Sequence, residues 1–168
     1  MPELAYEIRA KGPLFDDPTI QRTFDRMITT TLRDVGLFAQ RVAQAGAPHG
    51  ISSGGGGLRG SIYAELRGTP GVRAEVVTST AFYAAIVERG RAPGRTPPPT
   101  APVLLWVQRK LGLTGPAALH AAYLIARKIG RRGTVGAYYF RHAVAQVAPY
   151  AVTQFQELGA RIARQLNG

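Results

Sequence analysis

The segment from Pro18 to Ala45 limits the possible folds more than any other, because it reads as one long amphipathic helix. An Asp-Asp pair precedes the proline, which suits capping of the first free N–H groups and the positive end of the helix dipole. The helix is roughly 40 Å long, and a glycine and a second proline stop it. Because Thr29–Thr31 are poor helix formers, neighbouring elements must support its middle. Its apolar stripe follows steps of three and four, with one adjacent pair: Ile20, Phe24, Met27, Ile28, Val35, Phe38 and Val42.

Three short segments alternate apolar and polar residues, as half-buried strands do. They are Leu4–Ala10, Ile62–Arg67 and Val72–Val76, and the last two flank the turn Thr69-Pro70-Gly71. Together with the long helix they predict an α+β fold, in which a small antiparallel sheet packs against a long N-terminal helix.

Further helices are expected in the C-terminal half. The segment Ala81–Glu88 predicts a short helix, although its apolar residues also suit a strand. Pro102–Leu111 predicts a second helix, and Gly115-Pro116 opens a third. In a last helix, Pro149 should introduce a kink or a break. The expected apolar side of this helix consists of Val144, Val147, Val152, Phe155, Leu158, Ile162 and Leu166.

We expect a single domain over residues 1–168, because this length is enough for one substantial core. It would carry flexible loops at 47–57 and 89–100, the first rich in glycine and the second in proline and arginine, and a C-terminal helical extension at 141–168. With no apolar run near 18 residues and no secretory leader, neither a membrane span nor export is expected. The net charge of +11 favours an anionic partner such as nucleic acid, an anionic membrane or an acidic protein.

No pattern in the sequence points to catalysis. The chain has no cysteine, and His49, His120 and His142 lack metal-ligand spacing. Neither an HExxH motif nor a GxSxG nucleophile elbow is present. Gly55 to Gly60 have the spacing of a phosphate-binding loop, but Ser61 stands where the lysine is required. We therefore expect no catalytic, cofactor-binding or metal-binding residues and no enzymatic activity.

Two short motifs carry a resemblance to a known family. The first reads "LRxSI" after the glycine-rich loop, and the second reads "YAxxVExG" after the predicted hairpin. Residues Ile125–Ile129 and Arg131–Thr134 look like a third segment of longer members. In this order the motifs resemble the gene-ten-like tail-completion or head–tail joining (neck) proteins of long-tailed bacteriophages. The matching motif residues are Leu58, Arg59, Ser61, Ile62, Tyr83, Val87, Glu88 and Gly90.

The resemblance implies a structural virion protein of the neck or tail top, assembled in the host cytoplasm. Such a protein joins the head connector to the tail as part of a six- or twelve-fold homo-oligomeric ring. Its partners would be the head connector or stopper, the tail tube or tail terminator, and packaged DNA, which it would contact without sequence preference. No membrane partner is expected. The alternatives are a tail terminator ring protein and a sequence-nonspecific DNA-binding protein.

The basic residues are candidate contacts to DNA or to a neighbouring subunit. Four of them lie on two adjacent rows at the end of a predicted helix. We further expect Arg59 and Glu88, one from each motif, to form an ion pair within the chain or between subunits. The candidate contact residues are Arg89, Arg91, Arg95, Arg127, Lys128, Arg131 and Arg132.

Overall fold

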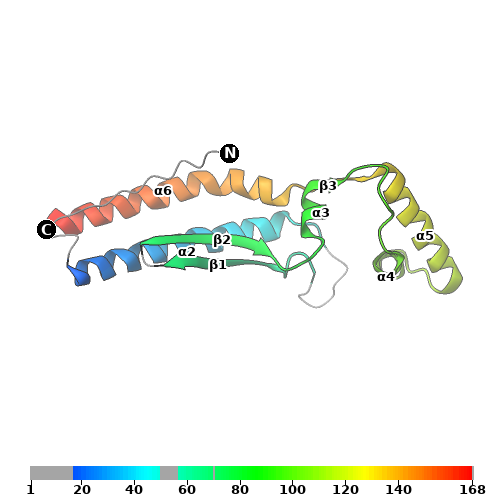
Figure 1. Cartoon of the computed structure of the whole chain (residues 1–168), viewed down its shortest axis with the longest axis horizontal. Coiled ribbons are helices and arrows are strands. Elements are labelled where there is room, and N and C mark those ends of the chain that lie inside the picture. The colour runs from blue at the N-terminus through cyan, green and yellow to red at the C-terminus, as the bar shows by residue number, and fades with distance from the viewer. Residues whose placement is uncertain (1–16, 50–56, 70, 168) are drawn as a thin grey trace.

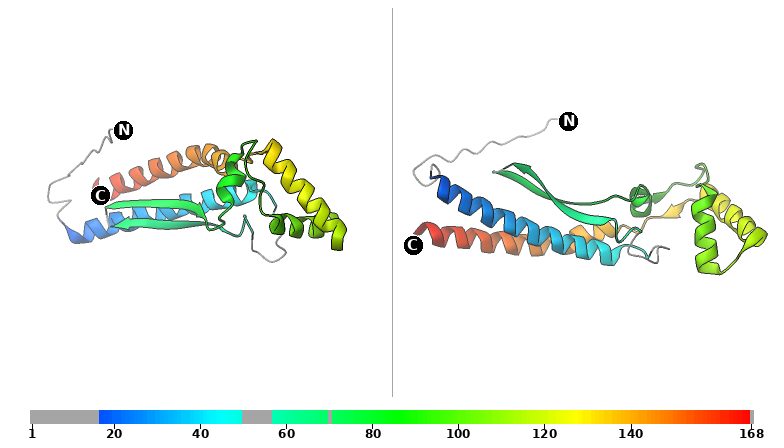
Figure 2. Two further views of the ribbon diagram at one scale, coloured as in Figure 1. Left: turned by 45° about the vertical axis from the view of Figure 1, so that its right-hand side comes forward. Right: turned by 90° about the horizontal axis from the view of Figure 1, so that it is seen from below.

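The computed structural model describes residues 17–49, 57–69 and 71–167. These residues form an elongated body and a helical arm that projects from one end of it (Figures 1 and 2). The body contains α2 (Pro18–Gly46), β1 (Ile62–Thr69), β2 (Val72–Ser79), α3 (Ala84–Arg89) and α6 (Tyr139–Asn167). The arm contains α4 (Thr100–Leu111) and α5 (Gly115–Arg132), and the short strands β3 (Gly90–Arg91) and β4 (Thr134–Val135) join it to the body.

Helix α2 forms where the sequence predicts it, with the predicted cap. The Asp17 side chain accepts a hydrogen bond of 2.7 Å from the Thr19 N–H, and Pro18 occupies the first turn. The helix ends when the Ala47 N–H donates to the Ala43 carbonyl. Its buried residues are small (Thr31, Gly36 and Ala43), so neighbouring elements approach its backbone closely.

Helix α6 lies antiparallel to α2 along most of its length. The Phe38 and Tyr150 rings are 4.4 Å apart, and Arg161 donates to the Thr31 hydroxyl at 3.3 Å. The segment predicted to be a C-terminal helical extension thus forms one of the two long helices of the body and packs against the other, α2. Pro149 lies inside α6 and does not divide it.

The predicted apolar side of the last helix is wrong in part. Val147 and Leu158 are buried as expected, together with Tyr139 and Ala143. The core-facing side is rotated toward Tyr139, Ala143 and Val147, because α2 offers small residues there for close packing. Consequently an apolar row remains exposed, consisting of Val144, Val152, Phe155 and Leu166.

Strands β1 and β2 pair antiparallel, with Ile62 opposite Ser79 and Thr69 opposite Val72. The hairpin of β1 and β2 packs on α2 through specific polar contacts. Gln40 Oε1 accepts from the Ala64 N–H, and Arg73 forms an ion pair of 2.7 Å with Asp25. The α+β fold class is confirmed, whereas the predicted strand Leu4–Ala10 lies outside the described residues.

The arm joins the body through a narrow two-stranded ribbon, in which Gly90 pairs with Val135 and Arg91 with Thr134. A side chain at Gly90 would meet the Thr134 carbonyl at 2.3 Å, and one at Gly133 would meet the Arg91 carbonyl at 2.1 Å. Both glycines also have positive φ, so only glycine fits this crossing without strain. Beyond the ribbon, α4 and α5 pack around a small core of Val107, Ala118 and Ala122.

Gly36 of α2 lies against the Glu75 side chain of β2. A Cβ atom added there would lie 2.1 Å from Glu75 Cγ on β2. Burial raises the pKa of Glu75, although Arg33 opposes the shift, and Glu75 Oε2 makes no hydrogen bond with the described residues. The position therefore requires glycine because of packing.

We expect Gly36→Ala to destabilise the fold by about 1–3 kcal/mol, because the added methyl forces β2 away from α2. Gly159→Ala is the matched control, since Gly159 is also a helical glycine but has no atom within 4 Å of an added Cβ. This control should stabilise the protein by about 0.5–1 kcal/mol through helix propensity. Urea unfolding of both variants is the measurement, and a stabilised Gly36→Ala variant would contradict the packing account.

Candidate functional site

The motif residues predicted from sequence come together at one junction, where α2 ends and α6 begins. Leu58 and Ile62 are buried there with Ala84 and Tyr139, and Tyr83 and Val87 pack against them. The Ser61 hydroxyl bonds both the Leu58 carbonyl and the Ser79 hydroxyl at 2.7 Å. The two motifs thus build the junction from opposite sides.

Arg59 caps the C-terminal end of α2. Its guanidinium donates to the Ala47 carbonyl at 2.7 Å and to the Ala45 carbonyl at 3.0 Å. These carbonyls have no partner inside a helix, and a cation there also suits the negative end of the dipole.

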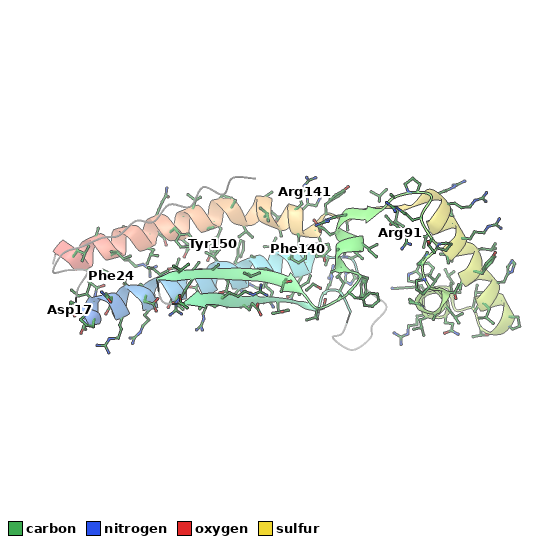
Figure 3. All side chains as sticks on the ribbon, viewed as in Figure 1. Asp17, Phe24, Arg91, Phe140, Arg141 and Tyr150 are labelled. Atoms are coloured by element: carbon green, nitrogen blue, oxygen red, sulfur yellow. The ribbon has the colours of Figure 1, made fainter. Side chains whose placement is uncertain are left out.

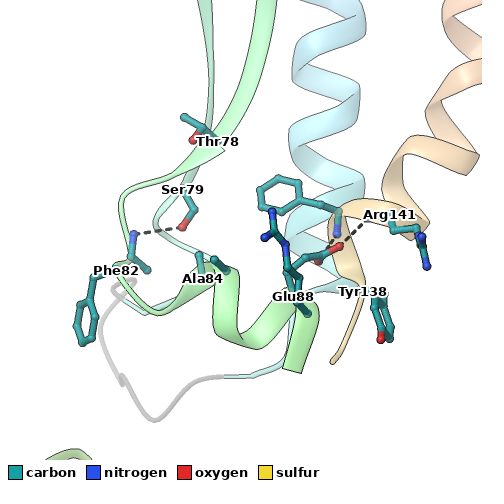
Figure 4. A pocket seen from close by; sticks show the side chains of 11 residues that line it. Thr78, Ser79, Phe82, Ala84, Glu88, Tyr138 and Arg141 are labelled. Atoms are coloured by element: carbon teal, nitrogen blue, oxygen red, sulfur yellow. Dashed lines mark hydrogen bonds between the residues drawn. The ribbon is translucent and has the colours of Figure 1, made fainter. Parts of the chain in front are cut away.

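Glu88 caps the N-terminal end of α6 (Figure 4). Its carboxylate accepts from the Phe140 N–H at 2.9 Å and from the Arg141 N–H at 3.1 Å. The expected ion pair between Arg59 and Glu88 is therefore wrong within the chain, because each charge satisfies a different helix end. A contact between subunits stays a prediction.

Among the described residues Tyr139 is the largest fully buried side chain, and it closes the junction from α6 with 1% of its surface exposed. A Cβ added at Gly46 would contact it, so the two helix ends touch. Burial raises the pKa of the Tyr139 phenol, and the negative charge of Glu88 adds to the shift. The phenol stays neutral at physiological pH, and its hydroxyl has no hydrogen-bond partner among the described residues.

A groove of about 690 Å³ lies beside the junction, between the end of β2, α3 and the start of α6 (Figure 4). Its rim carries Phe82, which is 90% exposed, as well as Arg89 and Arg141. Arg141 lies over the ring of Tyr138, 5.6 Å from its centroid. Of these aromatic and cationic groups, the sequence analysis singled out only Arg89 as a candidate contact.

The basic residues of the proline-rich loop have separate roles. Arg91, labelled in Figure 3, donates a hydrogen bond to the Thr96 carbonyl and so holds the loop closed. Arg95 is exposed, and its carbonyl lies against α5 at Gly130. Arg89 lines the groove beside the junction. Of the three, Arg89 and Arg95 are available for contacts.

The four cations of α5, which we call the basic cluster, are brought together as predicted. Arg127, Lys128, Arg131 and Arg132 are all exposed and line one shallow hollow of about 520 Å³ with Leu124. None forms an ion pair with an acidic side chain in the described part of the chain. A surface with four uncompensated cations suits an anionic partner.

Sequence reasoning missed the segregation of charge, although the signal is simple. All ten acidic residues lie outside 89–156, whereas ten of the 21 lysines and arginines lie inside it. This stretch accounts for +10 of the net charge of +11, and the remainder is almost neutral. Residues 92–133, which include both helices of the arm, carry seven of these cations and no acidic residue.

Sequence reasoning also missed how much apolar surface stays uncovered. Val135 on the ribbon is 92% exposed. On the arm, large apolar side chains are exposed on both helices and on the turn between them: Leu105, Trp106, Leu111, Leu113, Leu119, Tyr123 and Leu124. Exposed apolar side chains in this number on two helices and one turn are typical of an interaction site.

No family model, curated protein or solved structure matches this chain. Within the described residues, no group of three or more His, Asp or Glu side chains is arranged to hold a metal ion. Among those same residues, no helix combines the length and apolarity needed to cross a membrane.

Proposed function

We propose that this protein is a structural virion component of a bacteriophage neck or tail top. In this role it joins the head connector to the tail as one subunit of an oligomeric ring. The family resemblance of the two motifs motivates the proposal. The observation that carries it is the combination, in one arm, of uncovered apolar surface and uncompensated positive charge.

The uncovered surface of the arm supports a role as a subunit of an assembly. The buried residues that the structure describes in the arm are small apart from Val107, so two helices of this size gain little stability from each other. Contacts with neighbouring subunits would supply what is missing.

A ring can form if each subunit has two different uncovered surfaces, and one of them fits the other on a neighbouring subunit. Contacts between unlike surfaces close into rings or continue into filaments. Here the arm and the body present different surfaces, separated by the ribbon (Figure 1). The resemblance supplies the expected six- or twelve-fold symmetry, and the basic cluster would face DNA or an acidic patch of an adjoining ring.

Two alternatives remain. A tail terminator ring would use the same surfaces at the tube end. A sequence-nonspecific DNA-binding protein is favoured by one observation, the unpaired basic cluster, since phosphate attraction needs no base readout.

Electron microscopy of the purified protein with and without DNA, and of neck assemblies, tests the proposal. Rings, or decoration of tail ends, are the expected result. Where the purified protein alone forms no ring, the neighbouring connector proteins are added. Mass measurement should give six or twelve copies per neck. One or two copies per neck, or uniform coating of DNA without rings, would reject the joining role.

A further inference from the structure

The outward surface of α5 is divided along the length of the helix. Leu119, Tyr123, Arg127 and Arg131 follow one another at steps of four, so they form one row. Because α5 ends beside β4, the cations lie near the ribbon and the apolar residues lie toward the free end of the arm (Figure 1). We define the apolar tip as the exposed residues Leu111, Leu113, Leu119 and Tyr123.

The body offers an apolar groove of about 310 Å³ between β2 and α6, with α2 as its floor. Its floor is Ala39 and Ala43, and Val77 lines it from β2. The α6 wall includes Val144, which is 67% exposed. The wall continues along α6 with the exposed Val152 and Phe155, spaced to fall on the same side of the helix.

The tip and the groove do not meet within one chain. Among the described helices and strands, α4 and α5 pack extensively only on each other, and β3 and β4 hold them beyond the end of the body (Figures 1 and 2). Each chain has one tip and one groove. In an assembly of identical chains, every tip can therefore occupy the groove of a neighbour, and both surfaces are covered. A lipid surface would cover the tip and leave the groove open.

Charge favours this groove over two other hollows of the body. The groove beside the junction carries Arg89 and Arg141, while its one acid, Glu88, accepts from N–H groups of α6. Another hollow at the α2–α6 contact carries Arg41 and His142. Both would repel an arm that has seven cations and no acid in residues 92–133. The apolar groove has no charged lining residue, so it does not repel the arm.

The area is adequate for a specific contact. The four tip side chains are roughly half exposed and together present on the order of 300–400 Å², and Leu105, Trp106 and Leu124 raise the exposed apolar area of the whole arm to about 600–700 Å². A standard interface buries about 800 Å² on each partner.

We propose that the apolar tip of one chain docks in the groove between β2 and α6 of a second copy. This rests on the homo-oligomer of the proposed function and names its contact surfaces. The contact joins unlike surfaces, so each subunit gives its arm to one neighbour and receives an arm from another.

Disulfide trapping tests the contact, because the chain has no cysteine of its own. A Leu119→Cys variant is mixed with a Val144→Cys variant under mild oxidation. We expect the mixed disulfide to form about tenfold faster than in a mixture of Leu119→Cys with Val135→Cys, since docking raises the local concentration. Val135 is the control because it is 92% exposed and outside both surfaces. Equal rates in the two mixtures would overturn the proposal.

A mixing experiment tests the geometry. A tip variant (Leu119→Glu with Tyr123→Glu) and a groove variant (Val144→Glu) should each be monomeric by native mass spectrometry. All three positions are exposed, so both variants should fold. When mixed, they retain one intact arm and one intact groove, so a 1:1 heterodimer and nothing larger is expected. Failure to form the heterodimer, or vesicle binding by the tip without any cross-link, would overturn the proposal.

These results separate the two proposals. A neck ring without the 119–144 cross-link rejects this contact only. The cross-link in purified protein that is absent from any neck assembly rejects the joining role only.

Discussion

Replacing Arg127, Lys128, Arg131 and Arg132 together by glutamine is expected to leave the protein folded and to weaken its binding to duplex DNA by about 10²–10³-fold near 0.1 M salt. The four side chains line one hollow without an acidic partner in the described part of the chain. Removing one cation that neutralises a phosphate should reduce the slope of log K against log salt by about 0.9, so the set of four should reduce it by roughly 3–4. The measurement is a salt titration of binding to a DNA of arbitrary sequence.

Folding should survive because these cations repel one another. Like charges four residues apart cost a few tenths of a kcal/mol per pair, and the helix dipole offsets part of that cost. The glutamine variant should therefore unfold at the same or a slightly higher urea concentration. An early transition would mean that the cluster supports the arm.

A charge-matched control separates the cluster from the net charge. Replacing Arg22, Arg26, Arg41 and Arg164 on α2 and α6 by glutamine removes the same four charges from exposed positions of the body. This control should keep most of the affinity, because its cations lie away from the cluster. Equal reductions in affinity for the two variants would mean that only the net charge matters.

In assembled particles the same variant distinguishes the two partners. Reduced DNA retention would place the cluster at the channel, whereas reduced head–tail joining would place it against a protein. Unchanged particle yield, infectivity and DNA retention would make the cluster a solvated helix end.

The elements that the sequence predicted well are those encoded by local patterns. The cap at Asp17, the alternation in Ile62–Leu66 and the opening of α5 at Gly115 each depend on residues within a turn or two. Pattern also predicted that the basic residues of α5 would share one surface, because helical spacing alone decides it.

The remainder depends on tertiary contacts that no local pattern encodes. Glu88 is 52 residues from Phe140, and only the fold reveals that it caps α6. The rotation of α6 that exposes Val144 depends on small residues of α2. The charge segregation was visible in the sequence, but its meaning required the arm to project from the body.

Tyr139 provides the strongest expected effect on stability. Its ring is the largest fully buried side chain among the described residues and contacts both helix ends at the junction. Tyr139→Ala should cost about 3–5 kcal/mol, because the cavity lies where α2, β1 and α6 meet. That is a large part of the 5–15 kcal/mol typical of a domain, so the variant should be partly unfolded at 37 °C. Tyr123→Ala is the exposed control and should change stability by less than about 0.5 kcal/mol.

Tyr139→Phe should increase the free energy of unfolding, whereas Tyr139→Ala lowers it. The hydroxyl of Tyr139 is buried and makes no hydrogen bond with the described residues, so its removal avoids a desolvation cost of about 1–3 kcal/mol. Phenylalanine keeps the ring and its packing, and we expect the midpoint of urea unfolding to rise. If alanine and phenylalanine destabilise the protein equally, the hydroxyl has a partner, and the junction is held by that hydrogen bond and not by packing of the ring.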